Sequence, residues 1–354
     1  MNKKDTFEFR VTQDGSVGLY NFDVDDIYHS SYGAKSEAIE KFVRPLNFKK
    51  NFYEKKSVKV LDICYGIGYN TKAFLDLIRK INFKGKIFVD ALEYDKKLVE
   101  ISPFIKDGFY KFAPTISYVL LSELVKQNLC SIESLNILFD KKNSKYFEKD
   151  YLDYILKKIN YRYSHNQTSD LNRFLHNIYY HCISQRIKRR HKHLKIGNIN
   201  INYHIRDARQ SIKKLSAGYD IVFLDAFTPA KLPTLWTYDF FLRLHDLVNT
   251  DSILLTYSNS AAVRHAMLDA GFYVGKLFDK NHRNCGTVAS KNIKLIENQL
   301  DEYDLGLLST NAGVYFRDIN LDASAFEILQ EHSMRKQELN LVSSSSYIKS
   351  FKRH

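Results

Sequence analysis

The sequence predicts an α/β fold in which strands and helices alternate, with a helical segment inserted part-way along the chain. Three observations support this prediction. Short apolar runs of strand length recur along the chain. Segments with the apolar spacing of a helix lie between them. Residues 111–196 depart from this alternation, because their apolar residues follow helical spacing with no clear strand.

The elements follow one another in a regular order. A strand over residues 57–64 leads into a glycine-containing turn at 65–69 and a helix over 70–81, and a second strand over 86–92 completes a β-α-β unit. After the insertion, strands are predicted at 199–205, 219–224 and 252–257, with helices at 207–216, 234–248 and 261–270. Residues 272–278 and 287–290 are predicted to form a final antiparallel pair.

Composition favours a folded protein that binds a polyanion. The 354 residues include 53 Lys and Arg against 40 Asp and Glu, a net charge of +13, and 44% are hydrophobic, enough for a packed core. Four scattered cysteines do not suggest a disulfide framework. The chain has no apolar run long enough to span a membrane, and its first residues lack a signal-peptide core, so a cytoplasmic location is expected.

The positive charge is concentrated in the predicted insertion. Residues 111–196 carry a net charge of +9, whereas residues 296–354 carry −3. The densest run, residues 185–195, includes Arg186, Lys188, Arg189 and Arg190 and has no acidic residue. Such a cluster can contact the phosphates of a nucleic acid, while the alternative is a solubilising surface. We expect these four residues to contact the phosphates of a nucleic acid.

Glycines and acids follow the predicted strands, where ligands bind in doubly wound sheets. Gly66 and Gly68 follow the first strand and allow close approach of the backbone to a ligand. Glu93 ends the second strand, where a carboxylate can accept both hydroxyls of a ribose. Asp207 opens a predicted helix, and either caps it or accepts from an adenine amino group.

The most specific feature follows the strand at 219–224. Asp225 is succeeded by Phe227 and a proline-shaped loop, and then by Trp236. A carboxylate at a buried strand end can hold an amine and accept its proton, which leaves the nitrogen lone pair available for attack. The alternative is a structural turn capped by Asp225. The histidines and Cys182 of the insertion match no zinc-binding spacing, so no metal is predicted.

These residues resemble the methyltransferase module of the tRNA wobble-uridine modification enzymes, the MnmC/MnmD family. The stretch F-L-D-A-F-T-P-A-K-L-P-T-L-W-T at residues 223–237 matches the family signature. The glycine turn at 62–70, including Asn70, is similar to the family's glycine loop. Smaller similarities lie at residues 26–37, 256–258, 263–264 and 270–272, so that the resemblance covers about residues 20–110 and 197–290. The insertion and the residues 249–252, which replace a Gly-Gly pair, depart from the family.

The resemblance implies a Rossmann-like methyltransferase fold that uses S-adenosylmethionine. It implies methylation of the 5-aminomethyl group of the tRNA wobble uridine, giving 5-methylaminomethyl-(2-thio)uridine, with neither the flavin oxidase half of bifunctional members nor a metal. The methyltransferase domain would comprise residues 1–110 and 197–295, followed by a tail over 296–354. The alternative is a small-molecule amine methyl- or aminopropyltransferase on the same fold.

The resemblance also implies roles for individual residues. The cofactor would be bound by Gly66, Gly68, Asn70, Glu93, Asp207 and Asp225. Asp225 would also contact the amine as the catalytic residue. The substrate would be bound by Phe227 and Trp236 at the extruded base and by Lys231 at a phosphate.

Overall fold

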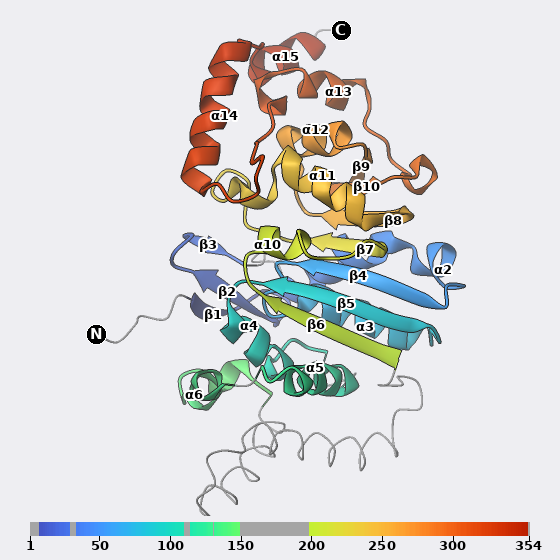
Figure 1. Ribbon diagram of the computed structural model, residues 1–354, viewed down its shortest axis with the longest axis vertical. Helices are drawn as coiled ribbons and strands as arrows, with labels where there is room; N and C mark the ends of the chain where they lie inside the picture. Colours follow the sequence, from blue (N-terminus) through green and yellow to red (C-terminus); the bar gives the residue numbers. More distant parts are fainter. Residues whose placement is uncertain (1–6, 29–32, 110–113, 130, 149–197, 353–354) are drawn as a thin grey trace, which may run out of the picture. The chain divides into compact units, whose positions relative to one another are not determined.

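The computed structural model describes residues 7–28, 33–109, 114–129, 131–148 and 198–352. Its main sheet has seven strands in the order β6-β5-β4-β7-β8-β10-β9 (Figure 1). They are β4 (Ser57–Ile63), β5 (Lys86–Glu93), β6 (Ile199–Ile205), β7 (Tyr219–Leu224), β8 (Val248–Thr256), β9 (Tyr273–Phe278) and β10 (Asn284–Ser290). β5 and β6, β4 and β7, and β7 and β8 pair in parallel, whereas β10 is antiparallel to β8 and β9. The predicted α/β class and the final antiparallel pair are confirmed.

Two strands begin earlier than predicted. β10 begins at Asn284 and not at residue 287. β8 begins at Val248, earlier than residue 252. Asn249, Thr250 and Asp251 are partly or fully exposed at the start of this strand, and only from Ser252 onward is every residue buried. An apolar run therefore marked only the buried part of β8.

The chain divides into two compact units, each described separately. The first unit comprises residues 1–58 and 65–205, and the second comprises residues 59–64 and 206–354. The two units are interleaved along the sequence. Most of β4 belongs to the second unit, whereas the glycine turn that follows it belongs to the first.

The first unit contains a small sheet, the pair β5–β6 and a set of helices. The small sheet has β1 (Phe7–Val11), β2 (Val17–Asn21) and β3 (Asp26–Ile27) in that order. The helices are α1 (Ala34–Glu37), η1 (Ala38–Val43), η2 (Arg44–Leu46), α2 (Phe48–Asn51), α3 (Tyr69–Lys80), α4 (Lys96–Ile101), η3 (Ser102–Phe104), α5 (Pro114–Lys126), α6 (Ile132–Phe139) and η4 (Ser144–Tyr146).

Helix α3 is buried along most of its length and is held by an internal ion pair. Lys72 is fully buried, and its Nζ lies 2.8 Å from Asp107 Oδ2 and donates to the carbonyl of Ser102 at 2.7 Å. Burial lowers the pKa of Lys72, and the charge of Asp107 opposes that effect. The pair fixes the helix that begins directly after the glycine turn.

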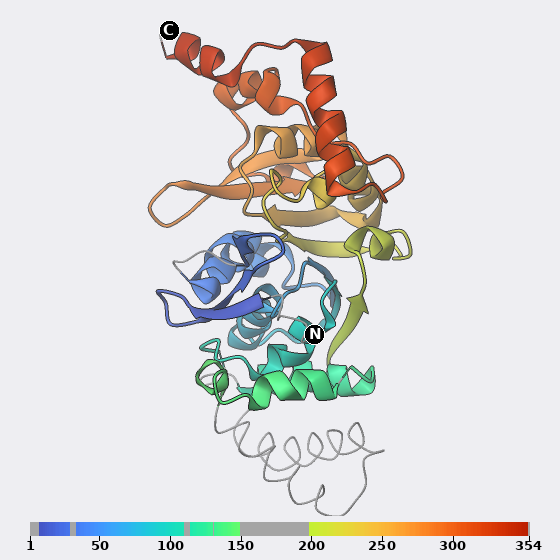
Figure 2. The ribbon, with the colours of Figure 1, turned by 90° about the vertical axis from the view of Figure 1, so that its left-hand side faces the viewer.

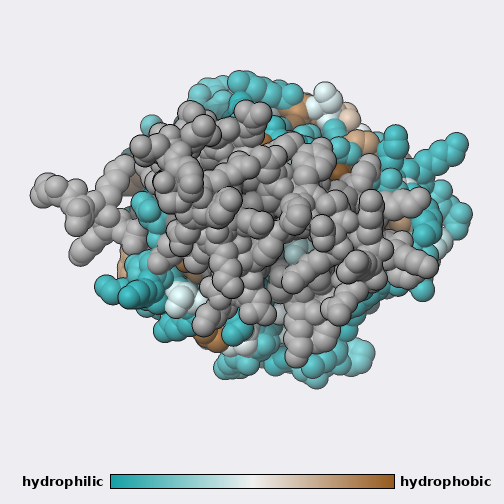
Figure 3. Space-filling model, turned by 90° about the horizontal axis from the view of Figure 1, so that it is seen from below, coloured by the Kyte–Doolittle hydropathy of each residue, from teal (hydrophilic) through white to brown (hydrophobic). Residues whose placement is uncertain are grey.

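The described part of the predicted insertion is helical and packs on β6. α5 lies beside β6 (Figure 2), where the side-chain amide of Gln127 donates to the carbonyl of Ile201 at 2.6 Å and accepts from the amide of Tyr203 at 2.9 Å. The basic run at 185–195 lies outside the described residues. Seen from below, the described surface that is visible is mainly hydrophilic (Figure 3).

The second unit pairs β4 with β7 and adds the C-terminal helices. Val60 lies opposite Ile221, and the amide of Lys59 donates to Asp220 Oδ2 at 2.9 Å across 161 residues of sequence. The helices are α10 (Ala208–Ile212), η8 (Pro233–Leu235), α11 (Tyr238–Leu247), α12 (Ala261–Asp269), η9 (Ile293–Leu295), α13 (Glu302–Leu308), η10 (Asn311–Gly313), α14 (Ala325–Leu339) and α15 (Ser344–Phe351). The described residues of the predicted tail are thus largely helical. In the described part of the chain, no helix is long and apolar enough to cross a membrane.

Candidate active site

The turn after β4 requires its glycines. Gly66 and Gly68 have φ angles of 55° and 81°, in the left-handed region that side chains disfavour. A Cβ atom on Gly68 would lie 2.4 Å from the hydroxyl of Tyr65, so the turn also leaves no room for one. The turn passes directly into α3, whose second residue is the buried Asn70.

Glu93 is fixed by backbone amides at the end of β5. Its Oε2 accepts from the amide of Gly66 at 2.7 Å, and its Oε1 accepts from the amides of Tyr94 and Asp95 at 2.8 and 2.9 Å. The structure therefore brings together Gly66 and Glu93, two residues that the sequence singled out separately. Burial raises the pKa of Glu93, although the three hydrogen bonds act in the opposite direction.

This arrangement fits a nucleoside ligand. A carboxylate can accept about four hydrogen bonds, and the backbone supplies three to Glu93. The remaining acceptor is oriented by those bonds and lies beside the buried glycine turn. An acceptor of this kind suits the hydroxyl groups of a ribose.

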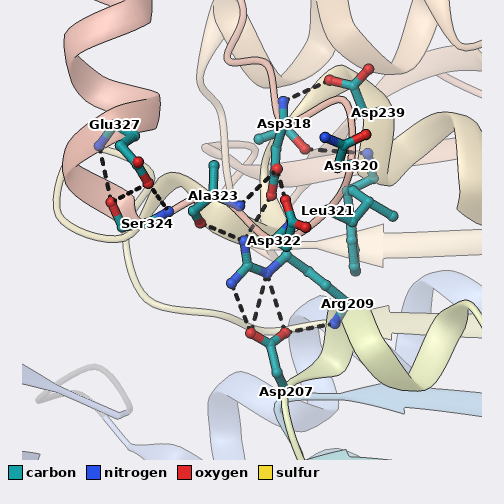
Figure 4. A network of polar contacts seen from close by, with 12 residues as sticks. Asp207, Arg209, Asp239, Asp318, Asn320, Leu321, Asp322, Ala323, Ser324 and Glu327 are labelled. Carbon is teal, nitrogen blue, oxygen red and sulfur yellow. Dashed lines mark hydrogen bonds and ion pairs between the residues drawn. The ribbon is translucent and has the colours of Figure 1, made fainter.

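Asp207 caps α10 in the second unit. Its Oδ1 accepts from the amide of Arg209 at 2.8 Å, which confirms the capping interpretation of this residue. The carboxylate also pairs with the guanidinium of Arg209 at 2.8 Å (Figure 4). Contact with adenine stays a prediction.

Asp225 begins a loop that is held at two successive carbonyls. The Asp225 amide donates to the carbonyl of Ile63 at 3.2 Å, and its side chain is half-buried. The hydroxyl of Tyr257 donates to the carbonyl of Ala226, and the indole of Trp236 donates to that of Phe227, both at 2.8 Å. Because the next two residues are fixed in this way, the path of the loop beyond Asp225 is defined.

The other predicted substrate residues differ in exposure. Trp236 is fully buried, with its ring edge-to-face against Tyr257 at 6.0 Å between centroids. Phe227 is half-buried and Lys231 is exposed. The structure thus gives Trp236 a supporting role in the loop, and its contact with a base stays a prediction.

Tyr257 is a residue whose role sequence reasoning missed. It lies within the short similarity at residues 256–258, but nothing in the local sequence indicates that its hydroxyl reaches Ala226, 31 residues earlier. Its position directly after a buried strand was the available signal.

Arg186, Lys188, Arg189 and Arg190 lie outside the described residues. Across the residues that are described, no group of three His, Cys, Asp or Glu side chains is placed to hold a metal ion.

Comparison with known proteins adds independent findings. Residues 169–292 match a family described as S-adenosyl-L-methionine-dependent methyltransferase. An uncharacterized protein of Methanocaldococcus jannaschii is 25% identical over 329 residues, covering 93% of this chain and 72% of that protein. The crystal structure of MNMC2 from Aquifex aeolicus superposes with a TM-score of 0.62 and 22% identity, covering 96% of this chain and 87% of that one, which shows the fold.

A shorter match is to a bifunctional tRNA-modification protein. The tRNA 5-methylaminomethyl-2-thiouridine biosynthesis bifunctional protein MnmC of Pseudomonas entomophila is 36% identical over 81 residues, or 23% of this chain. That match spans only 12% of the bifunctional protein. Taken with the fold, these matches support an S-adenosyl-L-methionine-dependent methyltransferase that is similar, over part of its length, to the MnmC proteins.

Proposed function

We propose that this enzyme methylates the 5-aminomethyl group of the tRNA wobble uridine and produces 5-methylaminomethyl-(2-thio)uridine. The observation that carries the proposal is the loop after β7, in which Asp225 is followed by two carbonyls held by Tyr257 and Trp236. The sequence of this loop is the part that most resembles the MnmC family, and a shared loop path would serve a shared substrate.

Asp225 is proposed to act on the amine. A primary amine is mostly protonated in water, and only its neutral form can act as a nucleophile. The Asp225 carboxylate would hold the amine by hydrogen bonds and accept its proton as the new nitrogen–carbon bond forms and the sulfur–methyl bond of the donor breaks, which leaves a neutral thioether. The fixed loop path would orient this carboxylate, so that part of the catalysis would come from positioning.

Cofactor binding is assigned to the glycine turn and the strand-end acids. Gly66, Gly68 and Asn70 would contact the cofactor beside α3, and Glu93 would accept from its ribose hydroxyls. Asp207 would accept from the adenine amino group. When bound, S-adenosylmethionine supplies an activated methyl group.

RNA binding is assigned to residues outside this set. Phe227 would contact the extruded base, with Trp236 beneath it, and the exposed Lys231 would contact a phosphate. The basic run that includes Arg186, Lys188, Arg189 and Arg190 would contact the tRNA backbone.

The proposal is tested by substituting Asp225. We expect Asp225→Asn to lower kcat by about a hundredfold or more on tRNA that carries 5-aminomethyluridine, because the amine loses its proton acceptor. S-adenosylmethionine binding should change much less than kcat, because the asparagine keeps an acceptor oxygen at this position. Asp246→Asn, at a side chain that is 60% exposed on the same unit, is the matched control and should keep full activity.

The product should be identified by mass analysis of the wobble nucleoside. Full activity of Asp225→Asn would remove the proposed role of this residue. Methylation of small amines in place of the tRNA would instead support the small-molecule alternative.

A further inference from the structure

Arg209 is at the centre of a buried polar network in the second unit (Figure 4). Its Nε and Nη2 donate to both carboxylate oxygens of Asp207 at 2.8–3.2 Å. Its Nη1 donates to Asp318 Oδ2 and to the carbonyl of Ala323, both at 2.7 Å. One guanidinium therefore joins the loop after β6 to a segment more than a hundred residues later.

Asp318 is itself fixed on several sides. Its Oδ1 accepts from the amides of Asp322 and Ala323 at 3.0 and 3.1 Å. Its own amide donates to Asp239 on α11 at 2.7 Å, and the neighbouring Arg317 pairs with the same carboxylate. Asp318 is thus an anchored anion, and it lies beyond residue 292, where the family match ends.

Exposure distinguishes the three charged side chains. Asp318 is 1% exposed and Arg209 is 11% exposed, whereas Asp207 is 34% exposed. Asp207 is therefore the most solvent-exposed of the three. Arg209 pairs with Asp207, and Asp318 pairs with Arg209. Two carboxylates share one guanidinium, so the group keeps a net negative charge and Asp207 remains an acceptor.

Arg209 keeps its positive charge in this network. Burial alone would lower the pKa of Arg209, but hydrogen bonds to Asp207 and Asp318 raise it overall. The bidentate contact of a planar guanidinium also fixes the plane of the Asp207 carboxylate, which a lysine could not do.

We propose that Arg209 and Asp318 are positioning residues that orient Asp207 toward the adenine amino group, so that the C-terminal segment takes part in cofactor recognition. The inference rests on the proposed function, specifically on the assignment of adenine to Asp207. It goes beyond capping, because a cap requires only the contact between Asp207 and the Arg209 amide.

The test compares two nucleoside probes that differ at one group. S-adenosylhomocysteine carries an amino group on its purine, and S-inosylhomocysteine carries an oxygen there. A carboxylate oriented toward this position accepts from the amine and repels the oxygen, so the unmodified enzyme should prefer the adenosyl probe. In Asp318→Asn we expect that preference, measured by calorimetry as a ratio of Kd values, to fall by about tenfold.

Three further variants separate positioning from folding. Arg209→Lys keeps the charge but loses the bidentate geometry and should also reduce the ratio. Adding Asp318→Asn to Asp207→Asn should change the ratio no further, because Asp318 acts through Asp207. Asp304→Asn is the matched control: it weakens another ion pair of the C-terminal segment, with Arg264 at 3.3 Å, and should leave the ratio intact.

The outcomes separate the two proposals. If the unmodified enzyme binds neither probe, the proposed function fails. If it binds both probes equally, or if Asp318→Asn and Arg209→Lys keep the full preference, the positioning role is overturned while cofactor binding stands.

Discussion

Glu93 shows how a single side chain combines a structural cost with a proposed binding role. Its pKa is raised by burial despite three backbone hydrogen bonds. The stability linked to its protonated form is therefore present below its ordinary pKa of 4.5 and is lost as the pH rises through the raised value. At neutral pH the ionised side chain lowers the free energy of unfolding, as expected for a group kept for function.

The raised pKa predicts a pH dependence of cofactor binding. Protonation removes an acceptor from Glu93, so affinity for S-adenosylmethionine should fall on acidification, starting at a pH above 4.5. Calorimetry between about pH 5 and pH 8 measures this effect. Glu93→Gln should bind about tenfold more weakly at neutral pH and lose the acid-side dependence.

The exposed Glu54 provides the control for this titration. Glu54→Gln should reproduce the binding curve of the unmodified enzyme. If Glu93→Gln retained the same loss of affinity at low pH, another group would be responsible.

At the scale of elements, α6 is anchored to α4 through one buried carboxylate. Ser131, which caps α6, donates to Glu100 Oε2 at 2.6 Å, and Ser134 donates to the same oxygen. Glu100 is 2% exposed at its side chain and also pairs with Lys96 at 3.1 Å. The first turn of α6 therefore depends on a residue outside the predicted insertion.

Removing this carboxylate should loosen α6 selectively. We expect Glu100→Ala to increase amide hydrogen exchange in α6 by about tenfold or more, since hydrogen bonds to a charged group contribute about 1.5–3 kcal/mol. Lys96→Ala removes only the half-exposed ion pair and should have a small effect. Unchanged exchange in Glu100→Ala would show that α6 is held by other contacts.

The strands were predictable because each is marked by an apolar run within its own few residues. Apolar runs at residues 57–64, 86–92, 199–205 and 219–224 coincide closely with β4, β5, β6 and β7. The partners of polar residues were not predictable in this way. Arg209 and Asp318 are 109 residues apart, and no periodicity relates them. The same holds for Trp236, whose complete burial depends on packing across the second unit.

At the scale of the whole molecule, the net charge of +13 is unevenly distributed. The predicted insertion carries +9, and the C-terminal segment carries −3. Several acids of that segment have defined partners: Asp318 pairs with Arg209, and Asp304 pairs with Arg264 and Lys276. The acidic segment therefore serves the fold, while the basic run is assigned to the RNA.

Neutralising Arg186, Lys188, Arg189 and Arg190 should weaken tRNA binding and leave S-adenosylmethionine binding nearly unchanged. The slope of log affinity against log salt concentration should become shallower by up to about 3, because each lost phosphate contact removes about 0.7–0.9. Neutralising the exposed Lys49, Lys50, Lys56 and Lys84 tests whether charge in general suffices. Equal effects of both sets would remove the special role of the basic run, and loss of cofactor binding would mean that the run supports the fold.

The assignment of residues 59–64 to the second unit has a consequence for synthesis on the ribosome. The hydrogen bond between the Lys59 amide and Asp220 can form only after 161 further residues have been translated. At about 5–20 residues per second, this delay is roughly 10–30 s. During that interval Val60, Leu61 and Ile63, which are fully buried in the finished fold, have no β7 to pair with. The nascent chain thus holds β4 without its β7 partner for much of its emergence, and the second unit can close only after the residues of the first have been translated.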